Sequence, residues 1–250
     1  MKVFLALTRR ELASFFFSIT GYVVIAAVTL LIGLSFVMLI ASLGNDTFPM
    51  PVTELFFNSA LFWIVLMLVT PVITMRLFAL EKSTGTFETL MTTPVGDLQV
   101  VVAKFAAALV FYIIMWLPTL VCLFIVGHYT NQAGALDAGT VGGMFLGIFL
   151  AGCMFLSLGC FASAVSRSQM VAAIISLVPN VCLFILAYIA QNVTGNGSWK
   201  TQALSYFTLF QQMQDFTRGV VDTRVVVFYL SITFFFLFLT LRAVESRRWK

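Results

Sequence analysis

The chain has 250 residues, of which 61% are hydrophobic and only 10% are charged. Soluble globular domains carry about 25% charged residues, so this composition excludes an ordinary soluble protein. The formal net charge of +4 is modest, and no nucleic-acid partner is expected.

Residues 1–17 have the pattern of an amphipathic helix. Apolar side chains recur at helical spacing around a polar run that contains Arg9, Arg10 and Glu11. Such a helix is typical of the membrane interface, and Gly21 offers a bend before the first long apolar block. The alternative is a frayed continuation of that block. A cleaved signal peptide is not expected, because its apolar part would span only roughly 7–15 residues.

Six apolar blocks follow, and each is free of Asp, Glu, Lys, Arg and His. Crossing about 30 Å of hydrocarbon takes roughly 20 helical residues, and backbone groups in lipid must be satisfied internally. A β-barrel would show alternating segments of about ten residues, and the blocks do not alternate. The sequence therefore predicts an all-α membrane protein, a single transmembrane domain over 1–250, with spans at 21–42, 57–75, 105–126, 140–165, 170–189 and 225–241.

Basic residues lie mostly on one side of this topology. With six spans, both termini, the loop 80–99 and the loop after the fourth span lie on the same side of the membrane. This side collects eleven of the 14 Lys and Arg residues, the other three being Lys200, Arg218 and Arg224. Positive charge marks the cytoplasmic side, so we expect a multi-pass protein of the cell inner membrane with both termini in the cytoplasm.

The outer segment 200–224 mixes apolar and polar residues. It is too apolar for a solvated loop and too interrupted for a full span. We therefore expect a re-entrant-like segment of short helices that packs on the outer end of the bundle.

The fourth predicted span carries a stripe of small residues at every fourth position: Gly139, Gly143, Gly147 and Ala151. In lipid, small residues allow helix backbones to approach closely. The stripe either packs within the chain or forms a subunit interface, and the sequence leaves both readings open.

The chain shows no site that could drive transport by itself. Carriers that use ion gradients usually keep ionisable residues inside the membrane, and the predicted spans have none. A P-loop of the form G-x-x-x-x-G-K-[ST] is absent, and no loop approaches the roughly 100 residues of a nucleotide-hydrolysing domain. The four cysteines lie in the spans without a C-x-x-C pair, so we expect neither a metal nor another cofactor in this chain. If the protein does work, its energy comes from a separate chain.

The loop 80–99 is where such a chain would attach. Gly85 or a neighbouring threonine can cap the start of a helix, and Pro94 ends it after about two turns. Phe87 and Leu90 then share one face. A short helix with an apolar face suits the groove of a partner protein, but it could equally rest on lipid.

This loop contains the motif Glu81-Lys82-x-x-Gly85-Thr86-x-Glu88-x-Leu90-x-x-x-Pro94. The motif resembles the signature loop of ABC-2-type permeases, which are membrane subunits of ABC exporters. Residues 8–16 and 159–169 are similar to the N-terminal helix and the second cytoplasmic loop of that family. Residues 216–224 and 241–249 resemble its gliding-motility-associated (GldF-like) branch, although Ile19-Thr20 stands where that branch often has a proline.

The resemblance implies an ABC-2 (type V exporter-like) permease fold and a loop that docks on a cytoplasmic ABC ATPase. Phe87 and Leu90 would anchor that contact, while Glu81 and Glu88 would offer carboxylates to basic groups of the ATPase. The implied coupling residues are Glu81, Lys82, Gly85, Thr86, Phe87, Glu88, Leu90 and Pro94. The implied second cytoplasmic loop contributes Ser163, Arg167 and Gln169.

The resemblance also implies the partners. ATP and Mg would bind to the ATPase, so this chain would not itself be an enzyme. A second copy or a homologous permease would complete the membrane part, and a periplasmic or envelope protein could join it. We expect a permease that couples ATP hydrolysis to export or mechanical work. The alternatives are an envelope-assembly or mechanotransmission subunit that moves no substrate, and a gradient-driven carrier or channel.

Overall fold

The structure is a computed structural model that describes residues 2–43, 54, 56, 57, 59–87, 96–130, 138–192 and 208–246. All regular elements within these ranges are helices, and six helical segments among them are long and apolar enough to cross a membrane. The predicted all-α fold with six transmembrane helices is therefore confirmed.

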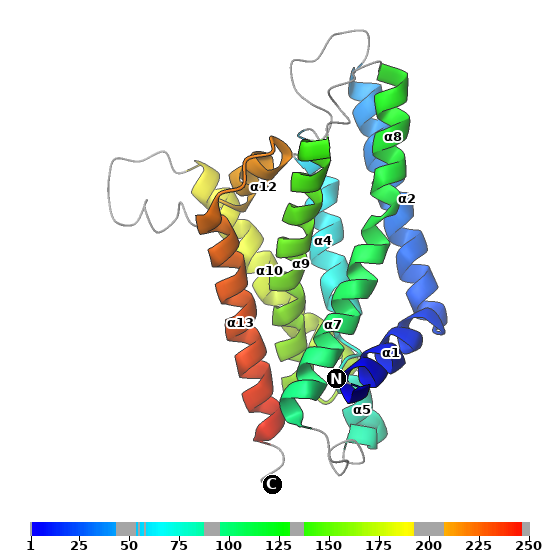
Figure 1. The fold of residues 1–250 in the computed structure, drawn as a ribbon, viewed down its shortest axis with the longest axis vertical. Helices are drawn as coiled ribbons and strands as arrows, with labels where there is room; N and C mark the ends of the chain where they lie inside the picture. Colours follow the sequence, from blue (N-terminus) through cyan, green and yellow to red (C-terminus); the bar gives the residue numbers. More distant parts are fainter. Residues whose placement is uncertain are drawn as a thin grey trace, which may run out of the picture.

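The long helices run side by side, with α1, α5 and the last turn of α13 at one end of the bundle and α12 at the other (Figure 1). The spans are α2 (Ile19–Leu43), α4 (Ala60–Thr74), α7 (Asp97–Trp116) continued by α8 (Pro118–Thr130), α9 (Ala138–Val165), α10 (Gln169–Asn192) and α13 (Thr223–Glu245). The short helices are α1 (Lys2–Phe16), α5 (Ala79–Thr84) and α12 (Leu209–Thr217).

Helix α1 is separate from the first span and crosses the end of the bundle obliquely (Figure 1). Its Phe15 is buried and stacks on Phe111 of α7 with ring centroids 4.9 Å apart, whereas Leu5 and Phe17 are exposed. A side chain on Gly21 would overlap the carbonyl oxygen of Phe15, so glycine is needed where the chain turns from α1 into α2. The alternative of a frayed first span is therefore wrong.

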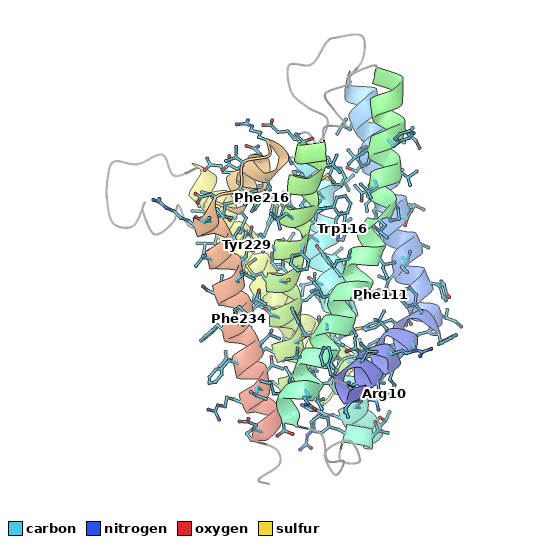
Figure 2. All side chains as sticks on the ribbon, viewed as in Figure 1. Arg10, Phe111, Trp116, Phe216, Tyr229 and Phe234 are labelled. Atoms are coloured by element: carbon cyan, nitrogen blue, oxygen red, sulfur yellow. The ribbon has the colours of Figure 1, made fainter. Side chains whose placement is uncertain are left out.

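Helix α9 is the centre of the bundle. In the most apolar stretch of α9, 78% is buried inside the protein, whereas 17% of the corresponding stretch of α13 is buried. On α13, Phe234 is 68% exposed and points away from the bundle, while Trp116 and Phe216 are buried (Figure 2). The outward side chains of α13 are thus available to lipid or to another subunit, whereas most of α9 is covered by its own chain.

The stripe of small residues packs within the chain. A Cβ atom on Gly143 would overlap the carbonyl oxygen of Phe216, and one on Gly147 would lie 3.0 Å from Met213 Sδ, so α12 sits directly on α9. Ala151 is buried as well, whereas Gly139 is exposed. The subunit-interface reading is therefore wrong for the three inner positions.

The third span begins earlier than the apolar pattern indicated. We expected it at residue 105, but α7 starts at Asp97 and carries Lys104 with only 1% of its surface exposed. A lysine tolerates such burial when opposite charges meet it. Lys104 precedes the predicted span but lies inside α7, so the start of this helix is a correction to the predicted boundary.

At the end of the bundle opposite to α5, an ion pair joins Arg218 to Glu54 in addition to the packing. Arg218 follows α12, and its Nη2 lies 2.6 Å from Glu54 Oε1 while its Nε lies 3.3 Å from Glu54 Oε2. The hydrogen bond to Glu54 raises the pKa of the Arg218 guanidinium. Asp222 then caps α13 by accepting a hydrogen bond from the backbone N–H of Arg224 at 2.8 Å.

Candidate functional site at the α1, α5 and α9 end

The loop with the recognisable motif begins as a short helix that the sequence did not predict. After α4 the chain turns and forms α5, which ends at Gly85 in the left-handed conformation with φ 74°. A glycine in that conformation is a common end of a helix. We expected Gly85 or a neighbouring threonine to cap the start of a helix. Gly85 ends α5, and Thr86 and Phe87 directly after it are helical, so a second helical stretch does begin here. Glu88, Leu90 and Pro94 lie outside the described residues.

Ser163 fixes the start of α5 to the end of α9. Its Oγ accepts hydrogen bonds from the backbone N–H groups of Phe78 at 3.0 Å and Ala79 at 3.1 Å, and it donates to the carbonyl of Met75 at 3.3 Å. The first N–H groups of a helix lack partners within it, so Ser163 supplies them. We expected Ser163 in a loop, but it is buried in the last turn of α9.

Lys82 makes the second connection between these helices. Its ammonium group donates a hydrogen bond to the carbonyl oxygen of Ala164. The C-terminal end of a helix favours a cation, so α5 is tied to α9 at both of its ends. The predicted second cytoplasmic loop also included Arg167 and Gln169. Arg167 is exposed between α9 and α10, and Gln169 is the first residue of α10.

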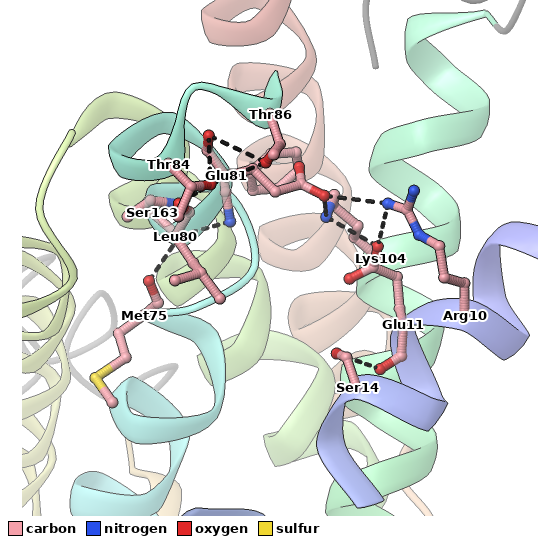
Figure 3. Close-up of polar contacts among 12 residues, drawn as sticks. Arg10, Glu11, Ser14, Met75, Leu80, Glu81, Thr84, Thr86, Lys104 and Ser163 are labelled. Atoms are coloured by element: carbon pink, nitrogen blue, oxygen red, sulfur yellow. Dashed lines mark hydrogen bonds and ion pairs between the residues drawn. The ribbon is translucent and has the colours of Figure 1, made fainter. Parts of the chain in front are cut away.

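A second set of contacts ties α5 to α1 and α7. Lys104 Nζ lies 2.9 Å from Glu81 Oε1 and 3.2 Å from Glu11 Oε1. Arg10 Nη2 lies 2.8 Å from the same Glu11 oxygen and 3.1 Å from the same Glu81 oxygen. Figure 3 shows these four side chains converging from three helices. We call Arg10, Glu11, Glu81 and Lys104 the charge cluster.

The charge cluster is electrically balanced and mostly buried. The side chain of Lys104 is 2% exposed, and those of Glu11 and Glu81 are 11% and 16% exposed. Removing charges from water costs several kcal/mol per ion unless opposite charges compensate, so the three buried members, Lys104, Glu11 and Glu81, depend on one another. The hydrogen bond from Arg10 to Glu11 raises the pKa of the Arg10 guanidinium.

Two expectations about the loop need correction. The Glu81 carboxylate is engaged inside the chain by Arg10 and Lys104, so it is not free for a basic group of a partner. Phe87 is only 7% exposed, and Lys82 Nζ lies 5.3 Å from its ring centroid, so this ring packs against its own chain. In the part of the loop that the structure describes, the open surface is the exposed tip, which consists of residues 83–86.

Sequence reasoning missed three members of the charge cluster: Arg10, Glu11 and Lys104. A signal for Glu11 was present, because Leu7, Glu11 and Phe15 are spaced four residues apart and share one helix face. An acid within an apolar stripe indicates a buried partner. Among the described residues, no three His, Cys, Asp or Glu side chains are grouped so as to hold a metal ion.

Six helical spans and a short helix fixed to their ends define a multi-pass helical membrane protein. A comparison with known families matches residues 55–244 to the ABC-2 family transporter protein. This match covers most of the chain, from the approach to α4 to the last turn of α13, and the chain therefore belongs to the ABC-2 family of transporter proteins. No curated protein matches the chain.

Proposed function

We propose that this permease subunit receives the work of a separate cytoplasmic ABC ATPase through the exposed tip at residues 83–86. The observation that supports the proposal is the way α5 is held. Ser163 and Lys82 attach it to α9, and Glu81 attaches it to α1 and α7. A force on the tip therefore reaches the central helix and the helix that precedes the first span.

This arrangement assigns different roles to the motif residues. The exposed Ser83, Thr84 and Thr86 meet the ATPase, while Lys82 and Phe87 keep the loop on the bundle. Gly85, in the left-handed conformation, forms the turn within this tip, between α5 and the helical residues Thr86 and Phe87. ATP and Mg bind to the ATPase, and a second copy of this chain or a homologous permease completes the membrane part. ATP-driven closure of the ATPases would rock the two bundles and drive export.

The proposed orientation follows from charge. Helix α1 and the last turn of α13 lie at the same end of the bundle as α5 (Figure 1). Eleven of the 14 basic residues belong to the side that the six-span order assigns to that end, the exceptions being Lys200, Arg218 and Arg224. This end faces the cytoplasm of the inner membrane. A topology reporter fused after Lys250 should be active in the cytoplasm, and one inserted at Asn196 should be active outside. Activity of both on the same side would reject six spans.

The docking role of the tip is tested by placing a bulky cation on it. Ser83 is exposed on α5 and bonds only to the nearby carbonyl of Leu80, at 2.8 Å, among the described residues. Ser83→Arg should therefore leave the free energy of unfolding within about 0.5 kcal/mol of wild type. It should still remove the ATPase, because the added arginine would keep the tip from packing closely against its partner. Losing a buried interface contact commonly costs about 2 kcal/mol, or roughly thirtyfold in affinity.

The measurement is co-purification of the ATPase with the tagged chain from native membranes at matched expression. Ser246→Arg is the matched control, since Ser246 is also exposed and follows α13 at the same end of the bundle. We expect the ATPase to be retained by wild type and by Ser246→Arg and to be lost from Ser83→Arg. Full retention by Ser83→Arg would exclude the tip as the docking surface.

A second candidate function is mechanical coupling to an envelope partner, as in the GldF-like branch that residues 216–224 resemble. In the structure this segment ends α12 and continues into a turn where Val220 is 56% and Val221 is 47% exposed. Exposed apolar residues on a braced turn suit a partner protein. A large periplasmic protein that co-purifies with wild type and is lost from Val220→Asp would favour this candidate over export, and an unchanged set of partners would remove it.

A further inference from the structure

The halves of α4 and α10 that lie away from α5 are clamped together by aromatic side chains. The ring of Trp63 on α4 lies 6.1 Å from that of Phe184 on α10 and 4.7 Å from that of Phe210 on α12, measured between centroids. Phe184 and Phe210 are in contact as well, at 5.4 Å. Aromatic pairs stabilise beyond the burial of their area, so the far halves of both spans form one packed unit with α12.

Both spans then reach a proline at the level where one polar contact ties them. Asn180 of α10 donates a hydrogen bond from Nδ2 to Thr70 Oγ1 of α4 at 3.0 Å, and both side chains are fully buried. Thr70 directly precedes Pro71, and Asn180 directly follows Pro179. A proline inside a helix removes one backbone hydrogen bond and favours a bend. Each helix is therefore weakened where it is tied to the other.

The surroundings of this tie hold polar atoms that the structure does not pair. Asn180 Oδ1 and Ser176 Oγ are buried and have no hydrogen-bond partner within the described part of the chain. Pro179 also removes the N–H group that would bond to the carbonyl of Ile175. Buried polar groups are normally paired. Unused groups at one level between two spans leave the junction free to adopt a second hydrogen-bonding arrangement.

Beyond the prolines, both spans run to α5. After α4 ends, the carbonyl of Met75 accepts a hydrogen bond from Ser163 at 3.3 Å, shortly before α5 begins. Helix α10 starts at Gln169, after the short turn that follows α9, and packs on α5. A displacement of α5 therefore acts on residues 71–78 and 169–178, which we call the near segments.

We propose that the two near segments swing together, hinged at Pro71 and Pro179, with the contact between Thr70 and Asn180 as the pivot. The clamped far halves supply the fixed side of this hinge. Its role in coupling rests on the proposed function, because the ATPase would move α5. The swing itself is a property of the isolated chain, so the hinge and the docking at the tip can fail separately.

Hydrogen–deuterium exchange of the isolated full-length chain in lipid nanodiscs, read by mass spectrometry, tests the hinge. In wild type the near segments should exchange faster than residues 60–69 and 181–190 of the clamped halves, because exchange reports local opening. Pro179→Ala restores a backbone hydrogen bond in α10 and should slow exchange about tenfold in both near segments. A merely local role of Pro179 would leave the near segment of α4 unchanged.

Three further variants separate the hinge from general stiffening. Pro118→Ala is the matched control, since Pro118 is the first residue of α8, where a proline costs no helical hydrogen bond, and it should change neither near segment. Ser176→Ala removes an unpaired hydroxyl and should preserve the joint slowing by Pro179→Ala. Asn180→Leu removes the contact with Thr70, so in this background Pro179→Ala should slow the near segment of α10 alone.

Three results would overturn the hinge: equal exchange of near segments and clamped halves in wild type, slowing by Pro179→Ala that stays within α10, or joint slowing that survives Asn180→Leu. Should Asn180→Leu fail to fold, Thr70→Val removes the same contact from the side of α4.

The coupling role is read in the complex with the ATPase. Pro179→Ala should raise the thermal midpoint of the chain and lower chain-dependent ATP turnover, a pair of opposite effects that a structural role of the proline would not produce. Unchanged turnover in Pro179→Ala would overturn the coupling role. A wild-type chain that binds no ATPase would contradict the docking at the tip, and the exchange measurement would still decide the hinge.

Discussion

Replacing Lys104 with Met should destabilise the protein by about 3–5 kcal/mol, the usual effect of removing one partner from a buried ion pair. Methionine has a similar length and an apolar stem, so the loss would come from charge rather than volume. Without Lys104 Nζ, the Glu11 and Glu81 oxygens that lie 3.2 Å and 2.9 Å from it would face each other. The free energy of unfolding, measured by denaturant titration in mixed micelles, reports this effect.

Two companion variants separate burial from charge. Arg10 contacts the same two oxygens but its side chain is 55% exposed, and exposed pairs contribute about 0–1 kcal/mol, so Arg10→Gln should have a small effect. Lys104→Met combined with Glu81→Gln should recover part of the loss, because one unpaired carboxylate is removed. Equal stability of wild type and Lys104→Met would show that the charge cluster does not hold α5.

Gly159→Ala should also be strongly destabilising. A Cβ atom at this position of α9 would lie 2.6 Å from Thr74 Cβ and 2.8 Å from Thr74 Cγ2, well inside contact distance. Thr74 is fully buried at the end of α4 and donates a hydrogen bond to the carbonyl of Thr70 at 2.8 Å, so it has little room to move. Overpacking of this kind costs about 1–3 kcal/mol.

Gly142→Ala is the matched control on the same helix, because a Cβ atom there meets nothing within 4 Å. Alanine in place of an unconstrained helical glycine should stabilise by about 0.5–1 kcal/mol. The two substitutions are therefore expected to have opposite signs in thermal unfolding of the purified protein. A loss of similar size for both would mean that α4 and α9 do not approach as closely as the structure indicates.

The spans could be predicted from sequence because the membrane imposes a length and forbids unpaired charge, and both constraints are local. The partner that packs against Gly143 and Gly147 could not be predicted, because the same stripe of small residues suits either α12 or another subunit. Only the path of residues 208–217 back onto α9 decides between them.

The burial of two charge-cluster residues could be predicted from sequence, but their pairing could not. The position of Glu11 in an apolar stripe and of Lys104 between Val100 and Ala108 indicates that both are buried. Their pairing depends on how α1 crosses the end of α7, which no local pattern encodes. The orientation of the Phe87 side chain could not be predicted from sequence either, because a short amphipathic helix can turn its apolar face to its own bundle or to a partner.

ATP hydrolysis in proteoliposomes tests whether this chain receives the work of a separate ATPase. The chain alone should hydrolyse no ATP, and hydrolysis should appear when the co-purified ATPase is added. Ser83→Arg should remove the dependence of that hydrolysis on the chain, while Ser246→Arg should keep it. Two results would contradict the proposed function: ATP turnover by the isolated chain with contaminating ATPases excluded, or an ATPase whose rate is the same without the chain, with wild type and with Ser83→Arg.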